Sequence, residues 1–468
     1  MNFSYRPLFT GAVFPFLVGC FLVAIPSVST ARVNDLYQQH CVVCHGERGE
    51  GGLGGSLING EYQYRDGEDA WAAVIREGLP DMGMKGYADE FTEEQIRSMV
   101  VYLRELEARA QAAPSVRPNR GVVKTEHLSY RIETIAESPN EMWGVSFLPD
   151  GQPIVTEING AVRLVADDGT LLSPLTGTPE VVHSGQGGML DIAVHPEYES
   201  NGWIYLAYSD GTSGSSITSV VRGRINGQRW VDEETIYRAD PKFGNSRGVH
   251  FGSRIVFNNG YVFFAIGDRG RQNQAQDLQR PNGKIHRMLE NGDLPPDNPF
   301  GSRSLPTIWS TGHRNPQALA FRPGTDELWS TEHGPRGGDE LNLIEPGKNY
   351  GWPKVTHGIN YNGTPITEHT ALPGLESPVL HWTPSIAVCG MAFVDGETYP
   401  EWEGDLLVGG LRAKVIERLR LQNGQVTEQE VILKNAGRVR DIKTSPDGEI
   451  YVILEGKGSR LVRLVPTR

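Results

Sequence analysis

The sequence predicts a mainly β protein, in which a small all-α domain precedes a six-bladed β-propeller. Two observations carry this prediction. A Cys-x-x-Cys-His motif stands near the start of the chain at Cys41, Cys44 and His45, next to segments with helical spacing. From about residue 126 onward, a unit made of an apolar strand, a turn and a second strand recurs six times. The length of 468 residues agrees, since it exceeds what one compact core usually organises.

Residues 1–31 have the pattern of an export signal. Arg6 supplies a positive charge, residues 8–25 are almost wholly apolar, and residues 29–31 are small enough for cleavage. Two alternatives stay open. Cys20 follows Leu-Val-Gly as in a lipoprotein signal, so a lipid anchor is one route to a membrane. The apolar run also approaches the ~20 residues that span a bilayer. Each alternative predicts a periplasmic or secreted protein.

Residues 32–111 form the predicted helical domain, which contains the signature for attachment of c-type haem. The thiols of Cys41 and Cys44 add to the haem vinyl groups, and His45 follows directly as the proximal ligand of the iron. A disulfide or half of a zinc site is the alternative. Zinc is disfavoured because no second Cys/His pair follows at a plausible spacing.

The iron needs a sixth ligand, and a thioether there favours electron transfer. Met82 and Met84 are the candidates. The segment around them resembles the methionine loop of small class I cytochromes c, which implies Met84 rather than Met82 as the axial ligand, although Lys85 stands where those cytochromes usually have proline. A capping box over residues 92–95 then begins a closing helix, and Met99 belongs to its apolar face.

Residues 112–125 are predicted to be a linker, because Ala, Pro, Ser, Asn and Gly dominate there. The propeller is predicted over residues 126–468. Its repeats are 47 to 72 residues apart, and their apolar strands contain Val145, Ile192, Ile255, Leu319, Met391 and Ile442. Six four-stranded units indicate six blades, and the 56 glycines and 30 prolines suit many tight turns. A β-sandwich with chance turns would not produce six similar hairpins.

The charge and the cysteines exclude other classes of protein. A formal net charge of −13 argues against a nucleic-acid partner held through phosphates. Only four cysteines occur, and two of them belong to the haem motif, so no disulfide framework is expected.

The loops between predicted strands are rich in glycine and polar residues. They carry one well-placed imidazole, His250, and a set of cations, Arg314, Arg412, Arg438 and Arg440. Guanidinium groups pair with carboxylates through two parallel hydrogen bonds. Converging arginines therefore suit a planar ligand with several negative charges, although each arginine taken singly is more often a solvated surface residue.

Three strings in this region make a resemblance specific. They are Gly-His-Arg-Asn-Pro-Gln at 312–317, Asn-Tyr-Gly-Trp-Pro at 349–353 and Arg-x-Arg-Asp at 438–441. With them, residues 130–465 resemble the soluble quinoprotein glucose dehydrogenase and aldose sugar dehydrogenase family. The resemblance implies the cofactors pyrroloquinoline quinone (PQQ) and Ca²⁺ beside the haem c. It also implies oxidation of an aldose sugar at C1 to its lactone, with electrons passed to the fused c-type haem.

The resemblance also implies roles for individual residues. His250 would be the general base for the sugar hydroxyl, with Asp268 orienting it and Gln186 flanking the sugar. Arg314 and Asn315 would hold the quinone oxygen at C5 and stabilise negative charge there. Arg438 and Arg440 would pair with cofactor carboxylates, and Arg412 stands where the family usually has lysine.

Three further assignments follow from the same resemblance. Trp382 stands where the family places an aromatic wall beside the cofactor or sugar, with propeller core as the alternative. The main-chain oxygens of Gly334 and Pro335 would bind Ca²⁺ together with PQQ. Asp339 and Glu340 resemble a second, structural calcium site, or are a solvated acidic pair.

The expected partners are a sugar substrate and a downstream electron acceptor, such as a cytochrome or a terminal oxidase. Two other classes stay open beside the dehydrogenase. One is a lactonase-type propeller with a metal in the central channel, and the other is a non-catalytic binding propeller. Either would carry the cytochrome domain as an electron carrier.

Overall fold

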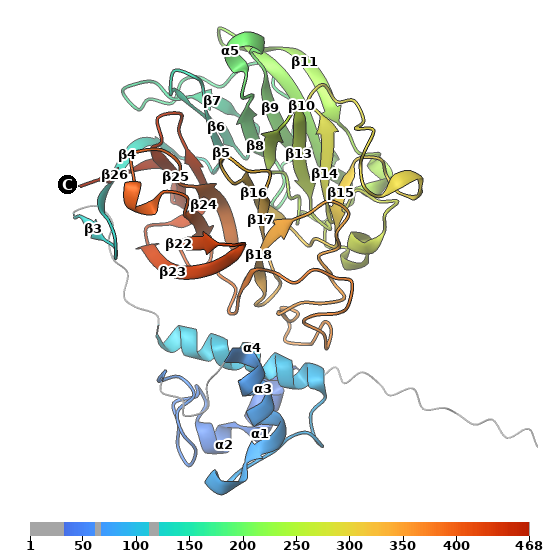
Figure 1. Ribbon diagram of the computed structural model, residues 1–468, viewed down its shortest axis with the longest axis vertical. Helices are drawn as coiled ribbons and strands as arrows, with labels where there is room; N and C mark the ends of the chain where they lie inside the picture. Colours follow the sequence, from blue (N-terminus) through green and yellow to red (C-terminus); the bar gives the residue numbers. More distant parts are fainter. Residues whose placement is uncertain (1–31, 61–66, 112–120, 468) are drawn as a thin grey trace, which may run out of the picture. The chain divides into compact units, whose positions relative to one another are not determined.

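The computed structural model describes residues 32–60, 67–111 and 121–467 (Figure 1). The predicted export signal with Cys20 lies outside these residues, as does most of the predicted linker. Residues Ala31–Arg468 form one compact unit. Within the described ranges, no helix is both long and apolar enough to cross a membrane.

The helical domain contains α1 (Val33–His40), α2 (Val42–His45), α3 (Gly67–Glu77) and α4 (Glu93–Ala110), with the short strands β1 (Gly78–Leu79) and β2 (Met84–Lys85) paired antiparallel. These elements are drawn in blue in Figure 1. The predicted capping box is present, because the Thr92 side chain accepts from the Gln95 N–H and the Gln95 side chain accepts from the Thr92 N–H. Behind it, Ile96 and Met99 are buried against Val33 of α1. The helical prediction is therefore confirmed.

Six antiparallel sheets follow. The first contains β5 (Met142–Phe147), β6 (Pro153–Glu157) and β7 (Val162–Leu164), and the second β8 (Met189–Val194), β9 (Ile204–Thr212), β10 (Ser215–Asn226) and β11 (Arg229–Tyr237). The third contains β12 (Ile255–Asn258), β13 (Tyr261–Ile266), β14 (Lys284–Leu289) and β15 (Ile308–Thr311). The short helix α5 (Tyr198–Asn201) joins β8 to β9.

The fourth sheet contains β16 (Pro316–Phe321), β17 (Leu328–Glu332), β18 (Asp339–Ile344) and β19 (Leu380–Trp382), and the fifth β20 (Val388–Phe393), β21 (Leu406–Gly410), β22 (Val415–Gln422) and β23 (Gln425–Lys434). The sixth contains β24 (Arg438–Thr444), β25 (Ile450–Gly456), β26 (Gly458–Pro466), β4 (Ser129–Ser138) and β3 (Val123–Lys124). Single 3-10 turns occur at η1 (Pro80–Met82), η2 (Pro241–Phe243), η3 (Gln272–Gln276), η4 (Gly301–Arg303) and η5 (Pro400–Trp402).

The first strands of the six sheets form a closed ring. Strands β5, β8, β12, β16, β20 and β24 contact one another in that order, and β24 contacts β5. Each of the six predicted repeats begins in one of these inner strands, so the six-bladed propeller is confirmed. The sheets are not all four-stranded, however, because the first has three strands and the sixth has five.

The ring is closed by strands from the two ends of the propeller. Strand β4 pairs antiparallel with β26, with Ser138 opposite Ser459 and Tyr130 opposite Pro466. Strand β3, inside the residues predicted as linker, extends the same sheet. Closure removes the unpaired edges that an open arrangement of sheets would expose.

One arginine ties the inner strands together at their centre. Arg254, just before β12, is 2% exposed and its Nη1 lies 2.9 Å from Asp191 Oδ1 of β8 and 3.0 Å from Asp441 Oδ2 of β24. Its Nε donates to the Gln317 carbonyl of β16 at 2.7 Å, and its guanidinium lies 4.2 Å from the ring centroid of Trp143 in β5. Arg254 therefore occupies the place where the blades converge.

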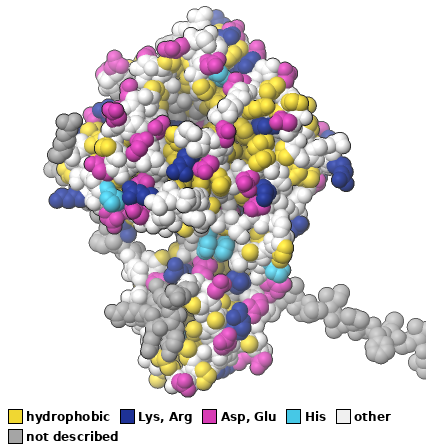
Figure 2. All heavy atoms as spheres, in the orientation of Figure 1, with side chains coloured by type: hydrophobic (Ala, Val, Ile, Leu, Met, Phe, Trp, Pro, Cys, Tyr) yellow, Lys and Arg dark blue, Asp and Glu magenta, His cyan; other side chains and the backbone are white. Residues whose placement is uncertain are grey.

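Acidic and basic side chains are interspersed on the face shown in Figure 2. Many form exposed ion pairs, such as Arg224 with Asp232 at 3.2 Å. Pairs of this kind contribute about 0–1 kcal/mol each. Fully burying a Leu or Val side chain contributes about 1.5–3 kcal/mol. The apolar clusters between neighbouring sheets, for example Leu407 with Val439 and Val452, therefore carry most of the stability.

Candidate functional site

His250 and Asp268 form a buried hydrogen-bonded pair in the third blade. His250 precedes β12 and Asp268 follows β13, and His250 Nδ1 lies 2.6 Å from Asp268 Oδ1. The Asp268 side chain is fully buried, and its Oδ2 accepts from Trp352 Nε1 at 2.8 Å. Because a carboxylate only accepts hydrogen bonds, Nδ1 carries the imidazole proton. The Nε2 lone pair of His250 is then free for a substrate proton.

The surroundings keep His250 neutral near pH 7. Burial lowers its pKa below the ordinary value of about 6.5, and the positive charge of Arg314 lowers it further, while Asp268 raises it in part. Although burial raises the pKa of Asp268, the hydrogen bond from His250 and the nearby cations bring it below its usual range. The pair is thus an oriented base with an ionised partner, as general base catalysis requires.

Gln186 holds the backbone of His250 in an unusual conformation. The φ angle of His250 is 55°, in the left-handed region that few non-glycine residues adopt. Its N–H donates to Gln186 Oε1 at 2.7 Å, and the N–H of Gln186 donates to the Gly248 carbonyl at 2.7 Å. Gly185 allows this approach, because a Cβ there would lie 2.3 Å from the Gly248 oxygen. The structure therefore brings the predicted Gln186 next to His250.

Arg314 and Asn315 come from the neighbouring fourth blade. Both precede β16, and their backbone N–H groups donate to Glu332 Oε2 at 2.6 and 3.3 Å. The Asp268 N–H donates to the Arg314 carbonyl at 2.8 Å, which joins the two loops. The predicted base and the predicted cation are thus in one site. Glu332, which holds the loop, was not found from the sequence.

Buried polar atoms without partners mark room for a ligand in this site. Among the described residues, Arg314 Nε and His333 Nε2 are buried and have no hydrogen-bond partner. Burial lowers the pKa of His333 to about 3, with the charges of Arg314 and Arg440 acting in the same direction, so this ring is neutral. Unpaired buried donors are costly unless a ligand or water satisfies them. Of these two atoms, the Arg314 N–H is the donor that an acceptor-rich ligand such as a quinone would satisfy.

Trp352 is the aromatic residue of this site that the role assignments from the sequence missed. It belongs to the Asn-Tyr-Gly-Trp-Pro string, and its indole N–H donates to Asp268. The Arg314 guanidinium lies 5.4 Å from the centroid of its ring. The signal was in the sequence as part of a family string, but nothing in that string indicated a contact with Asp268.

Arg438 and Arg440 share one carboxylate. Arg440 Nε donates to Glu455 Oε1, and Arg438 Nε donates to Glu455 Oε2 at 3.0 Å. Arg440 Nη2 also donates to Glu141 Oε1 at 3.1 Å. The charge of Arg440 contributes to the lowered pKa of His333, and its side chain is 11% exposed, whereas the side chain of Arg438 is 47% exposed.

Arg412 follows β21 and contacts the helical domain. Its side chain is 53% exposed, and its Nη1 lies 3.9 Å from Glu105 Oε1 of α4. Arg412 is therefore oriented by a carboxylate of this chain, and a role in holding PQQ stays a prediction.

Trp382 lies in the propeller core. Its indole packs with Trp329 and Leu341, and its Nε1 donates to Glu417 Oε2 at 2.9 Å. These contacts agree with the core alternative, and a role as an aromatic wall beside the cofactor or sugar stays a prediction. The indole that does contact the candidate base pair is that of Trp352.

Gly334 and Pro335 are buried in the loop after β17, and Asp339 shapes this loop. Asp339 Oδ1 accepts from the Gly334 N–H at 2.8 Å, and its two oxygens accept from Ser385 Oγ at 2.9 and 2.8 Å. Burial raises the pKa of Asp339 to about 6. Through these hydrogen bonds the carboxylate holds the loop in place.

The side chains of Asp339 and Glu340 do not point the same way, and the structural calcium site stays a prediction. Both lie in β18, where successive side chains point to opposite faces of the sheet. Glu340 Oε2 accepts from Asn342 Nδ2 at 3.0 Å. Burial raises the pKa of Glu340 to about 8, and the nearby Glu332 carboxylate adds to the effect. Adjacent carboxylates on a strand cannot converge on one ion without a bulge.

The haem motif has the geometry that its chemistry requires. Cys41 and Cys44 are free thiols at the start and within α2, and His45 ends this helix. His45 Nδ1 is hydrogen-bonded to the Gly55 carbonyl at 2.8 Å, which leaves Nε2 for a metal. A Cβ at Gly54 would lie 2.8 Å from His45 Cε1, so glycine is needed beside the ring. Two thiols and one oriented imidazole fit a covalently bound haem.

The two candidate methionines differ in burial. Met84 in β2 packs against the same hydrophobic cluster as Cys41 and Val42. Met82 is 61% exposed, and Met99 is buried within α4. Met84 is therefore the methionine on the haem-motif side of this domain.

The helical domain contacts the propeller at the loop that carries Gly334 and Pro335. Arg336 Nη2 lies 2.7 Å from Glu105 Oε2, and these side chains are 12% and 2% exposed. The Val33 N–H donates to the Gly363 carbonyl at 3.0 Å, and Ile359 joins the hydrophobic cluster of the helices. The domain with the haem motif thus contacts the residues next to the candidate PQQ and calcium loop.

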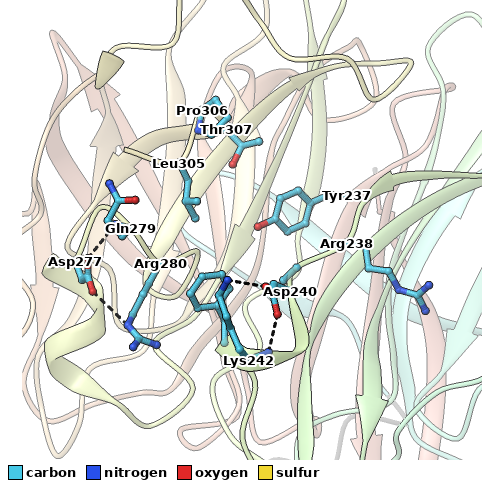
Figure 3. Close-up of a pocket in the computed structure, with 12 residues that line it drawn as sticks. Tyr237, Arg238, Asp240, Lys242, Asp277, Gln279, Arg280, Leu305, Pro306 and Thr307 are labelled. Carbon is cyan, nitrogen blue, oxygen red and sulfur yellow. Dashed lines mark hydrogen bonds and ion pairs between the residues drawn. The ribbon is translucent and has the colours of Figure 1, made fainter. Parts of the chain in front are cut away.

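A separate cavity of about 610 Å³ lies at the side of the third blade (Figure 3). Its cations are already paired, since Lys242 contacts Asp240 at 2.6 Å and Arg280 contacts Asp277 at 3.2 Å. None of the predicted site residues lines it. This cavity is therefore not the candidate active site, despite its volume.

Comparison with known families matches both parts of the chain. Residues 137–463 match the family model described as glucose / sorbosone dehydrogenase. Residues 29–103 match the model described as cytochrome C oxidase, cbb3-type, subunit III. The aldose sugar dehydrogenase YliI of Escherichia coli is 40% identical over 347 residues, which are 72% of this chain and 92% of that protein.

Solved structures agree with this match. The apo-form of the soluble aldose sugar dehydrogenase from Escherichia coli aligns with a TM-score of 0.69 and 38% identity, over 72% of this chain and all of that chain. The PQQ-bound form of an aldose sugar dehydrogenase from Streptomyces coelicolor aligns with a TM-score of 0.60 and 27% identity, over 72% of this chain and 98% of that one.

Proposed function

Because the chain belongs to the glucose/sorbosone dehydrogenase family and carries an N-terminal cytochrome c domain, we propose that it is a PQQ-dependent aldose sugar dehydrogenase. The reaction is oxidation of the sugar at C1 to its lactone, with the electrons passed to the fused c-type haem. A similar solved enzyme is described as PQQ-bound, which supports the cofactor. The observation that carries the proposal is the oriented His250–Asp268 pair beside the unpaired Nε of Arg314.

The side chains of the site divide the work. His250 Nε2 accepts the proton of the sugar hydroxyl at C1, and Asp268 stabilises the imidazolium that forms. Arg314 and Asn315 stabilise negative charge that develops on the acceptor. PQQ, when bound, supplies the two-electron acceptor chemistry that no side chain provides. Per turnover the sugar loses two electrons and two protons.

Ca²⁺ belongs to the same proposal. It prefers oxygen ligands, including backbone carbonyls. The carbonyls of Gly334 and Pro335 would hold it beside the cofactor, in a loop that Asp339 keeps in place through the Gly334 N–H. Arg440 would pair with a cofactor carboxylate in exchange for part of its contact with Glu455.

The haem is a one-electron carrier on the same chain, so it would accept the two electrons of the reaction one at a time. The buried contact between Glu105 and Arg336 supports this coupling, because it joins α4 to the loop next to Pro335. A downstream cytochrome or terminal oxidase would then take electrons from the haem. The haem motif and the signal-like residues 1–31 support a periplasmic or secreted location, with membrane attachment only through a lipid at Cys20.

The two other functional classes fit the centre of the ring less well. A metal-dependent lactonase needs carboxylates and amides that converge on the central channel. Here Arg254 fills that place and neutralises Asp191 and Asp441. A non-catalytic binding propeller would not need a buried carboxylate to orient an imidazole with a lowered pKa.

The test follows the haem α-band of the purified holo-protein after addition of PQQ, Ca²⁺ and a panel of aldoses. We expect haem reduction only when both cofactor and sugar are present, and its loss in His250→Ala. His195→Gln, which alters a histidine paired with Glu290 outside the site, serves as the matched control. Reduction of an artificial dye without haem reduction would retain the dehydrogenase and refute the coupling. No reduction of either acceptor would refute the proposed function.

A further inference from the structure

Two histidines and one glutamate meet where the helical domain contacts the propeller. Glu68 lies in the first turn of α3, His357 in the loop between β18 and β19, and His381 in β19. Their donor atoms all lie within 4.8 Å of one another. Across the described ranges, no other group of three or more His, Cys, Asp or Glu side chains brings its donor atoms this close.

The arrangement of the three side chains is compact and partly closed to solvent. The rings of His357 and His381 are stacked with centroids 3.7 Å apart and an interplanar angle of 10°. His357 Nδ1 lies 3.9 Å from Glu68 Oε2, and these side chains are 18% and 23% exposed. The two histidines are not hydrogen-bonded to each other, and the distance from His357 to Glu68 is longer than that of an optimal ion pair. Neither interaction explains why the three side chains are clustered. The separations leave space between the donor atoms.

The protonation states suit a cation. Although burial raises the pKa of Glu68, the neighbouring His357 and His381 bring it below its usual range. Burial and the neighbouring His357 lower the pKa of His381 to about 4. An ionised carboxylate and a neutral imidazole are the forms that bind metal ions.

The donor set selects the kind of ion. Imidazole nitrogen and carboxylate oxygen together are ligands of Zn²⁺, which binds them at about 2.0–2.2 Å in a tetrahedral arrangement. Tetrahedral ligands at that range are about 3.3 Å apart, so side-chain rotations must bring the farthest donors closer by roughly 1.5 Å. An adjoining cavity of about 20 Å³, lined by Glu68, His357 and Gly358, has room for one water as a fourth ligand.

We propose that Glu68, His357 and His381 bind one Zn²⁺ ion and that this ion fastens the cytochrome domain to the propeller. Glu68 comes from the helical domain and both histidines from the propeller, so the ion bridges the two domains. The site uses neither the haem motif nor the residues around His250. The proposal therefore does not depend on the proposed function.

The test uses the full-length holo-protein, stripped with a chelator, re-equilibrated with Zn²⁺ and passed through a desalting column. Elemental analysis should find one zinc ion per chain. The substitutions His381→Ala, His357→Ala and Glu68→Gln should each weaken zinc binding by about 100-fold or more, because each removes a ligand. His127→Ala removes a histidine that lies 3.5 Å from Glu428 elsewhere, and it should leave the zinc content unchanged.

Thermal unfolding gives a second readout. Zinc should raise the unfolding temperature of the wild type but not that of the three variants, since an ion stabilises only the state that binds it. Far-UV circular dichroism and the haem spectrum verify that each variant is folded. Equal zinc content in wild type and His357→Ala/His381→Ala, or no zinc in the wild type, would overturn the proposal. Zinc uptake that leaves the unfolding temperature unchanged would overturn the bridging role.

Discussion

At the scale of single residues, the candidate chemistry depends on how one imidazole is held. Asp268 binds His250 Nδ1, and Trp352 and the Gly270 N–H bind Asp268 in turn. Gln186 holds the His250 backbone at a positive φ that costs about 1–3 kcal/mol in general. The surroundings thus determine the tautomer, the direction and the basicity of the ring.

The pH dependence of kcat/KM should report the pKa of His250. A general base must be neutral, so kcat/KM falls as the pH decreases through that pKa. Because burial and Arg314 lower the pKa, we expect the acidic limb below the ordinary value of about 6.5. Dye-coupled rates over a pH series measure it. A limb centred above this value would contradict the described environment.

Asp268→Asn should separate positioning of the base from simple folding. Loss of the carboxylate removes the charge that raises the pKa of His250, so the acidic limb should move to lower pH. The rate should also fall by about 10²- to 10⁴-fold, the usual contribution of general base catalysis. An unshifted pH profile with a reduced rate would indicate a structural role only. Circular dichroism checks that the variant is folded.

At the scale of elements, the loops before the inner strands carry the site and the strands hold the loops. His250 precedes β12 and Arg314 precedes β16, so the spacing of two blades sets the spacing of base and cation. Arg254 in turn joins β8, β16 and β24 below them. The rigidity of the site therefore depends on the centre of the ring.

Arg254→Met should destabilise the propeller strongly. It leaves Asp191 and Asp441 buried without their cation, and breaking a buried pair in this way costs about 3–5 kcal/mol. Urea unfolding followed by tryptophan fluorescence measures the free energy of unfolding. The matched control Lys348→Met removes exposed pairs with Glu345 and Glu376 and should cost less than about 1 kcal/mol. Equal costs would mean that the central pairs do not hold the ring.

The β1–β2 hairpin should supply the sixth ligand of the haem iron. Met84→Leu removes a partly buried thioether, so the reduction potential should fall and the spectrum of the six-coordinate haem should be lost. Met82→Leu, at an exposed position of the same hairpin, is the control and should leave both unchanged. The reverse outcome would move the assignment to Met82. Spectroelectrochemistry provides both quantities.

At the scale of the whole molecule, the contact between the two domains links chemistry to electron flow. Glu105 of α4 lies between Arg336 and Arg412, and Glu68 of α3 meets the histidine pair. Both contacts involve propeller loops near Gly334, where the calcium and PQQ site is proposed. The two proposals can be tested separately, because zinc content and haem reduction are independent readouts.

Glu105→Gln should uncouple the domains without stopping sugar oxidation. The substitution leaves Arg336 without its buried partner, so the docked arrangement loses stability. Stopped-flow measurement should show slower reduction of the haem by sugar, while the rate with an artificial dye stays at the wild-type level. Glu93→Gln, at an exposed position of the same helix where the carboxylate pairs with Arg76 within the helical domain, is the control. An unchanged rate of haem reduction would show that electron transfer does not need this ion pair.

Local sequence patterns were sufficient to predict the features that depend on neighbouring residues. Cys41, Cys44 and His45 stand within five positions, and the capping box at 92–95 and the six inner strands follow from short-range spacing. The Asp339–Glu340 calcium site was inferred from two neighbouring residues and stays a prediction, which the strand geometry of β18 does not support. Adjacency along the chain is not adjacency in space, because a strand sends the two side chains to opposite faces.

The sequence by itself thus determined the helical domain with its haem motif, the six-bladed propeller and the family, and it predicted a base with its cation. Only the tertiary structure decided which groups hold them. Glu332 behind Arg314, Trp352 on Asp268, Arg254 at the centre of the ring and the Glu68–His357–His381 cluster all join distant segments. Such contacts leave no periodic pattern or fixed spacing in the sequence. They arise from how the blades close around an axis and not from the geometry of one helix or strand.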